Sequence, residues 1–145
     1  MGTEASDRVV QADLHELILI GCDRPEDAGG IARAASMLGW HTRLVPGIRA
    51  LGDLASAADT IAVVCDGGNG RECGDVAREL RELHHDLPII VVSSNSSHRF
   101  IVGVLNRGAN DVLIEPVTPE ALSTSIGTIM SEREARGRGG LEAAR

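Results

Sequence analysis

Short apolar runs alternate with longer segments of helical periodicity along most of this chain. Each run has the length of a strand and is uninterrupted by polar residues, as expected for strands that are covered on both faces. Such an alternation is typical of βα units wound into a mostly parallel sheet. The predicted strands are residues 17–21, 42–45, 61–65, 88–92 and 111–114, and the second of these is inferred partly from the rhythm of the others.

The segments between the predicted strands carry helix start and stop signals. We expect Asp23 to cap a first helix that stops at Gly39, and Thr118 with Pro119 to open the last one. A fourth helix is expected over 97–107 with Gly108 at its end, and a poorly specified one over 49–57. The residues expected to face the sheet are Ile31, Ala35 and Leu38 in the first helix, Val76, Ala77, Leu80 and Leu83 in the third, and Leu122, Ile126, Ile129 and Met130 in the last.

The chain has 145 residues, which is enough for one domain with a hydrophobic core and too few for two domains of ordinary size. We predict a mobile N-terminus over 1–14 and a single α/β domain over 15–134. The glycine-rich segment 135–145 is predicted to be a flexible tail or the start of a linker to an output domain.

Composition excludes several classes of partner. The formal net charge is −7, and one Trp and one Phe are the only aromatic residues, so direct nucleic-acid binding is not expected. No apolar run approaches the roughly 18 residues that span a bilayer, and the first residues lack an apolar leader. Three cysteines without a CxxC spacing fit a reducing compartment. We therefore expect a cytoplasmic protein without membrane contact.

The second half of the chain resembles the closing half of a bacterial response-regulator receiver domain. The relevant segments are 87–94, an apolar strand followed by Ser, and 108–122, which reads GANDVLIEPVTPEAL. The receiver pattern has a strand ending in Ser or Thr, and then Gly-Ala-x-Asp-aromatic-Leu-x-Lys-Pro. The resemblance covers about 16–131 and implies a flavodoxin-like, CheY-like (βα)5 fold: a doubly wound five-stranded parallel sheet of order 2-1-3-4-5, with its site at the carboxyl ends of the strands.

In receivers, two acidic residues after the first strand and an aspartate ending the third hold Mg²⁺, and that aspartate accepts a phosphoryl group. A hydroxyl ending the fourth strand and a lysine ending the fifth bind the phosphoryl group, while an aromatic residue on the fifth strand responds to it. The resemblance places Cys22 and Asp23 on the acidic pair, Cys65 on the acceptor, Ser93 on the hydroxyl, Val112 on the aromatic residue and Glu115 on the lysine.

These replacements predict a degenerate phosphorylation pocket. Mg²⁺ prefers hard oxygen ligands, which thiols at two of three carboxylate positions do not supply. A carboxylate in place of the lysine repels a phosphoryl group by roughly 4 kcal/mol for unit charges about 4 Å apart at an effective dielectric constant of about 20. All 14 basic residues are Arg, so no other register restores the ammonium group. We therefore expect a non-enzymatic pseudo-receiver, independent of aspartyl phosphorylation, with no cofactor and no metal.

Two alternatives stay open. A slip of one residue at the third strand makes Asp66 the phosphoryl acceptor, and the chain is then a phosphorylated receiver in two-component signal transduction or a phosphorelay. Alternatively, Cys22 and Cys65, at the ends of adjacent strands, form a redox-active or soft-metal thiol pair. The simpler interpretation of both cysteines is that each is a small buried apolar residue.

The resemblance also indicates where partners bind. In receivers like this one, the face of the fourth helix, fifth strand and fifth helix commonly forms a homodimer or docks a protein partner or output domain. The corresponding residues here include Phe100, Ile101, Val104, Arg107 and Asp111, of which Phe100 fits an anchor or a core position equally. Pseudo-receivers occur in transcriptional regulators, clock proteins and pilus-assembly ATPases.

Overall fold

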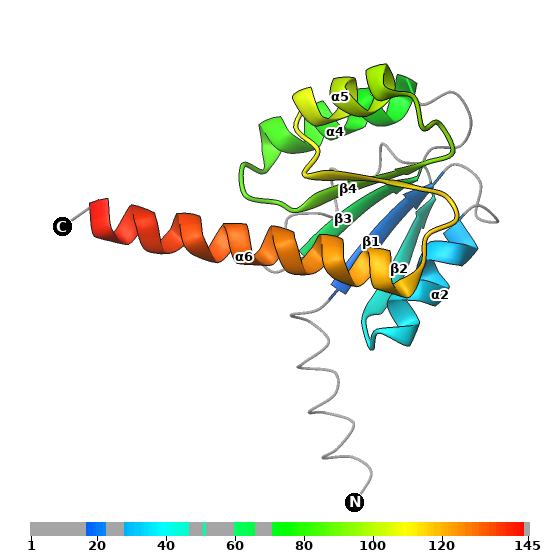
Figure 1. Ribbon diagram of the computed structural model, residues 1–145, viewed down its shortest axis with the longest axis horizontal. Coiled ribbons are helices and arrows are strands. Elements are labelled where there is room, and N and C mark those ends of the chain that lie inside the picture. Colours follow the sequence, from blue (N-terminus) through cyan, green and yellow to red (C-terminus); the bar gives the residue numbers. More distant parts are fainter. Residues whose placement is uncertain (1–16, 23–27, 47–50, 52–59, 66–70, 144–145) are drawn as a thin grey trace, which may run out of the picture.

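The computed structural model describes residues 17–22, 28–46, 51, 60–65 and 71–143. Its sheet is wholly parallel, with strands in the order β2-β1-β3-β4-β5 (Figure 1). This is the predicted doubly wound order, so the α/β fold class is confirmed. The strands are β1 (Leu17–Cys22), β2 (His41–Pro46), β3 (Thr60–Cys65), β4 (Ile89–Ser93) and β5 (Asp111–Ile114).

Helices cover both faces of the sheet (Figure 1). The described helices are α2 (Gly29–Met37), α4 (Arg71–Leu83), α5 (His98–Asn106) and α6 (Pro119–Ala143). One layer contains α4 and α5, and its core cluster includes Val64, Leu80 and Val91. The other layer contains α2 and α6, and its core cluster includes Ile31 and Ile126. The sheet therefore separates two hydrophobic cores.

The side chains of β3 alternate between these two cores. Ile61 and Val63 lie in the α2–α6 cluster, whereas Ala62 and Val64 lie in the α4–α5 cluster. Successive side chains of a strand point to opposite faces, so a strand covered on both sides needs apolar residues at every position. This is why β3 and β4 appear in the sequence as continuous apolar runs.

The strand register brings the carboxyl ends of four strands to one edge of the sheet. Gly21 of β1 pairs with Val64 of β3, and Cys65 pairs with Val92 of β4. Ser93, the last residue of β4, pairs with Ile114, the last residue of β5. The residues that follow these strands therefore meet at the same edge, which is where sheets of this type hold their sites.

The predicted cap of α6 is confirmed, and the structure adds a cap to α5, whose predicted span begins at Ser97. Ser97 precedes α5 and its side chain accepts a hydrogen bond from the amide of Phe100 at 3.2 Å. Thr118 precedes α6 and accepts one from the amide of Ala121 at 3.1 Å. Gly108, predicted to end the helix before β5, has a φ of 121°, which side chains other than glycine rarely adopt.

Two predictions about the earlier helices are wrong. The described α2 begins at Gly29 with Ala28 at its N-cap, whereas Asp23 was predicted there and lies outside the described residues. In α4, Leu83 is 65% exposed although its spacing places it on the buried face. It is the last residue of the helix, and Leu87, just before β4, is buried in the α4–α5 cluster. Helical periodicity does not show where a helix passes the edge of its sheet.

The last helix is longer than predicted. α6 continues to Ala143 and projects beyond the sheet (Figure 1), and the flexibility predicted for 135–145 stays a prediction. Strong helix formers at 132–136 extend the helix, and each later glycine costs only about 1 kcal/mol relative to alanine. The predicted mobile segment 1–14 lies outside the described residues, as does most of the predicted helix over 49–57. Among the described helices, none is long and apolar enough to cross a membrane.

Candidate functional site

Ser93 and Glu115 lie next to each other at the carboxyl edge of the sheet. The amide of Glu115 donates a 3.0 Å hydrogen bond to the carbonyl of Ser93, which joins the ends of β4 and β5. Ser93 is fully buried, and its Oγ accepts a hydrogen bond from the amide of Asn95 at 3.0 Å. Glu115 is exposed and precedes Pro116 through a cis peptide bond. The structure therefore brings these two predicted site residues together.

Cys22 and Cys65 are the last residues of the adjacent strands β1 and β3. Because Gly21 pairs with Val64, the two cysteines follow at matching positions of the two strands. Their side chains are outside the described part of the structure, as are Asp23 and Asp66 altogether. The assignments of these four residues to a phosphorylation pocket stay predictions. Within the described ranges, no group of three His, Cys, Asp or Glu side chains is placed to hold a metal ion.

Val112, predicted to take the position of the receiver aromatic residue, packs inward. Its side chain is half-buried against the α4–α5 cluster, and so is that of Phe100 on α5. A valine cannot swing between a buried and an exposed position across the distance that an aromatic ring covers. Val112 therefore contributes to the core beneath α5.

Comparisons with known proteins identify the fold. No family model matches the chain, and no curated protein does. Among solved structures, a pilus assembly-related protein from Burkholderia pseudomallei superimposes with a TM-score of 0.71 at 20% identity, covering 82% of this chain and 92% of that one. A CheY-like response-regulator receiver domain from Methanospirillum hungatei gives 0.69 at 20% identity, covering 83% and 98%. The chain has the receiver fold.

A third structure with the receiver fold is an atypical orphan response regulator described as having a phosphorylation-independent regulatory mechanism. It gives a TM-score of 0.66 at 17% identity and covers 79% of this chain and 95% of that one. The receiver folds that match thus include a CheY-like domain and an atypical regulator. At these identities the likeness concerns the fold, and the chemistry of each site has to be judged from its own residues.

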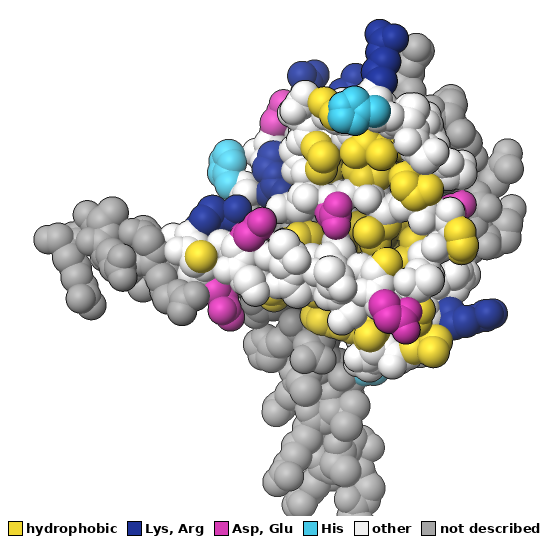
Figure 2. All heavy atoms as spheres, in the orientation of Figure 1, with side chains coloured by type: hydrophobic (Ala, Val, Ile, Leu, Met, Phe, Trp, Pro, Cys, Tyr) yellow, Lys and Arg dark blue, Asp and Glu magenta, His cyan; other side chains and the backbone are white. Residues whose placement is uncertain are grey.

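In the receiver fold, α5, β5 and α6 form one side of the molecule, which we call the α5–β5–α6 face. Figure 2 shows hydrophobic side chains gathered on this side between α5 and α6. Of the residues predicted here, Val104 is buried in the core and Phe100 is half-buried against it. These two residues support α5 from beneath, and Val104 offers no surface to a partner.

Two other predicted residues, Arg107 and Ile101, lie on different sides of α5. Arg107 pairs with Asp75 of α4 at 3.3 Å, so it lies on the α4 side of the helix. Ile101 lies about 120° around the helix from Arg107, at 100° per residue. Leu105, one turn after Ile101, is 39% exposed and Val102 is 38% exposed. Leu105 was not predicted, although its i, i+4 spacing from Ile101 was a usable signal.

Asp111, the remaining predicted residue, is tied into β5 and α6. Its Oδ2 accepts a 2.6 Å hydrogen bond from the hydroxyl of Ser125, and its Oδ1 accepts one from the amide of Val112 at 2.8 Å. Ser125 is buried, whereas Asp111 is half-buried. The carboxylate is thus held in a fixed orientation at the surface between the strand and the helix.

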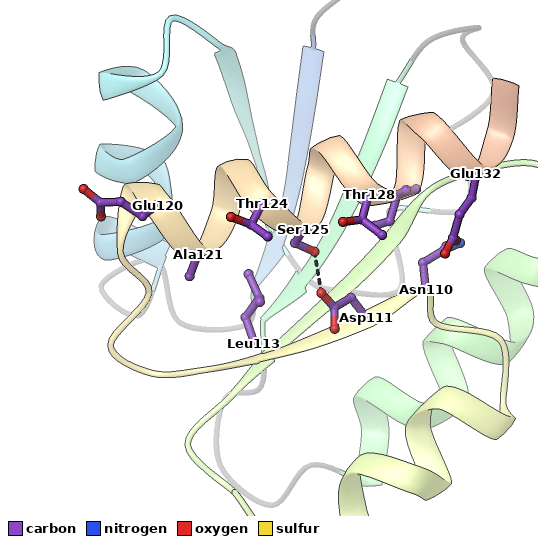
Figure 3. Close-up of a pocket in the computed structure, with 10 residues that line it drawn as sticks. Asn110, Asp111, Leu113, Glu120, Ala121, Thr124, Ser125, Thr128 and Glu132 are labelled. Carbon is purple, nitrogen blue, oxygen red and sulfur yellow. Dashed lines mark hydrogen bonds between the residues drawn. The ribbon is translucent and has the colours of Figure 1, made fainter. Parts of the chain in front are cut away.

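A groove of about 500 Å³ runs between β5 and α6 on this face. Figure 3 shows the hydrogen bond from Ser125 to Asp111 in its wall, with Leu113 nearby. We call this hollow the β5–α6 groove. Its lining residues are Asn110, Asp111, Leu113, Glu120, Ala121, Thr124, Ser125, Thr128, Ile129 and Glu132.

Arg81 of α4 joins three segments at the opposite edge of the sheet. Its guanidinium donates to the carbonyl of Gly108 at 3.1 Å and to Oδ1 of Asn110 at 2.7 Å, and to the carbonyls of His84 and His85. Asn110 Oδ1 also accepts from the amide of Ile89 at 2.8 Å. Burial, and secondarily the charge of Arg136, lower the pKa of Arg81. In the sequence, Arg81 is only one of several charged residues on the exposed side of this helix.

Proposed function

We propose that this chain is a receiver-like signalling module that acts through protein contacts, without enzymatic activity and independently of aspartyl phosphorylation. The observation that carries the proposal is the position of Glu115, directly after β5 and bonded through its amide to the carbonyl of Ser93. The receiver resemblance assigns these two positions to the lysine and the hydroxyl that hold the phosphoryl group. Here a carboxylate replaces the ammonium group and repels a phosphoryl group.

The absence of lysine supports this proposal independently of any alignment. All 14 basic residues of the chain are arginines, so no nearby residue can replace the missing ammonium group by a shift in register. Arginine is not equivalent there, because its planar guanidinium is larger and donates in a fixed fork. The chain therefore has no residue of the basic type that receivers use to bind the phosphoryl group, although Ser93 keeps the hydroxyl.

Mg²⁺ does not fit the residues at the ends of β1 and β3. Receivers bind this ion through carboxylates, whereas Cys22 and Cys65 end these two strands. Mg²⁺ takes oxygen ligands in near-octahedral geometry and binds thiols poorly. The proposed module therefore does not use Mg²⁺-dependent phosphoryl transfer.

The surface available for contacts is the α5–β5–α6 face. Leu105 and Val102 expose more than a third of their surfaces on α5, and all of β5 is half-buried. Met37, Leu44 and Leu83 are more exposed and lie on other elements, so the receiver resemblance, together with this apolar surface, selects the α5–β5–α6 face. We propose that a protein partner, an output domain or a second copy of the chain packs on this face, in the cytoplasm.

The experiment is a titration of the isotope-labelled chain with Mg²⁺ and beryllofluoride, a phosphoryl mimic, followed through its amide resonances. The expected result is an unchanged spectrum. The matched control is a variant carrying Cys22→Asp, Cys65→Asp and Glu115→Lys. It should gain a response if these are the three positions at which receivers carry their carboxylates and lysine. Shifts around Ser93 and Glu115 in the unmodified chain, abolished by Asp66→Asn, would instead establish phosphorylation at Asp66.

A further inference from the structure

Of the ten described residues that line the β5–α6 groove, Asp111, Glu120 and Glu132 are acidic and none is basic. The guanidinium of Arg81 on α4 reaches the Asn110 end of the groove, where it donates to Asn110 Oδ1. Within the described part of the chain, none of the three acidic side chains forms an ion pair within 4.0 Å. Figure 3 shows Glu132 beside Asn110 at one end, Glu120 at the other, and Asp111 between them. A cation that enters this groove therefore meets carboxylates along its length.

The groove also has an apolar part and small side chains along its wall. Leu113, Ala121 and Ile129 supply apolar surface, and most of the other α6 residues carry small hydroxyl side chains. Small residues along one face of a helix leave room for another chain to approach. The volume of about 500 Å³ is comparable with that of pockets that hold ligands, which span roughly 300–1,000 Å³. The groove can therefore accept side chains from a partner.

The carboxylate of Asp111 is held in one orientation and keeps acceptor positions that a cation could use. Ser125 and the amide of Val112 each donate to one of its oxygens, which fixes the plane of the carboxylate. An ionised carboxylate has about four acceptor positions, so capacity remains for a guanidinium or an ammonium group. A fixed acceptor loses little side-chain entropy when it binds.

We infer that the β5–α6 groove binds a cationic peptide segment of the protein partner, with an Arg or Lys side chain between Asp111 and Glu132 and an apolar side chain against Leu113. This inference rests on the proposed function, because it names the chemistry of the partner that the module contacts. The supporting argument is charge complementarity: the groove is acidic, and the whole chain carries a net charge of −7, which attracts cationic segments over a distance.

The test uses two synthetic peptides of equal length. In one, arginine alternates with alanine and leucine, and in the other every arginine is replaced by glutamate. We expect amide shifts at residues of the β5–α6 groove with the arginine peptide only, and weaker binding at higher salt. Glu132→Gln and the double variant with Asp111→Asn should weaken binding, by about tenfold for the double variant. Glu82→Gln, which removes the same charge from the exposed side of α4, is the matched control and should bind normally.

Equal binding of both peptides, shifts located elsewhere, or undiminished binding by Glu132→Gln and the double variant would overturn the inference. Glu132 is exposed, so its substitution tests the groove even if Asp111→Asn perturbs the fold. The proposed function fails separately: a response to beryllofluoride would contradict it and leave the peptide result unaffected. Conversely, if the chain neither binds the arginine peptide nor responds to beryllofluoride, only the inference of a cationic partner segment fails, and the proposed function stands.

Discussion

Ser125 on α6 donates a 2.6 Å hydrogen bond to the carboxylate of Asp111 on β5. The donor is buried and the acceptor is half-buried, so this bond joins the last helix to the edge strand beside the β5–α6 groove. We expect Ser125→Ala to lower the free energy of unfolding by about 1–2 kcal/mol, because a bond to an ionised group is lost. Urea denaturation measures the change. Ser123→Ala, at an exposed position of the same helix, should change stability little.

Arg81 joins α4 to the segment between α5 and β5 through hydrogen bonds to Gly108 and Asn110. Arg81→Ala should therefore lower the free energy of unfolding by about 2–3 kcal/mol, since several acceptors lose a charged donor. Arg78, exposed on the same helix, gives the matched control Arg78→Ala. Equal stability of the two variants in thermal or urea unfolding would contradict this role of Arg81.

Alanine substitution is predicted to have opposite effects on stability at Gly108 and at Gly103. At Gly108, φ is 121° and an added Cβ would lie 2.8 Å from the Cβ of Arg81, so Gly108→Ala should destabilise the fold. At Gly103, within α5, an added Cβ meets nothing within 4 Å, so Gly103→Ala should stabilise it by about 0.5–1 kcal/mol. Melting temperatures measured side by side test both signs, and a stabilised Gly108→Ala variant would show that the turn tolerates a side chain.

Leu105 is the most exposed large apolar residue of α5. If the α5–β5–α6 face forms a homodimer, Leu105→Arg should reduce the molar mass measured by light scattering to that of one chain, because it places a charge in an apolar contact. Leu83→Arg, which changes an exposed leucine of α4, is the control and should leave the mass unchanged. A dimer that survives Leu105→Arg would place self-association on another surface.

The sequence predicted the parts of the fold that depend on local pattern. Continuous apolar runs identified the central strands, and the capping residue Thr118 identified the start of α6. It failed where tertiary geometry decides: Leu83 has the correct spacing but lies at the end of its helix, and Val104 was assigned to a surface that it supports from beneath.

The candidate site was predictable in the same partial way. Strand ends could be aligned, so Ser93 and Glu115 were expected at one edge of the sheet, and the structure brings them together. The β5–α6 groove was not predicted, because its lining comes from two elements whose separation no local pattern specifies. Of its residues, only Asp111 had been singled out as a site residue, from its place in the resemblance.

Because α6 is long and extends past the sheet, a small tilt at its base displaces its far end by several ångströms. Its first turns pack on the sheet through Leu122, Ile126 and Ile129, and the helix then continues past the sheet to Ala143. Its 25 residues span about 37 Å at 1.5 Å per residue. A tilt of about 10° at its base therefore carries the far end through about 6 Å for a rod of that length. A partner that shifts the packing of Leu122 by a fraction of an ångström would tilt α6. The resulting displacement of the helix grows with distance from the core.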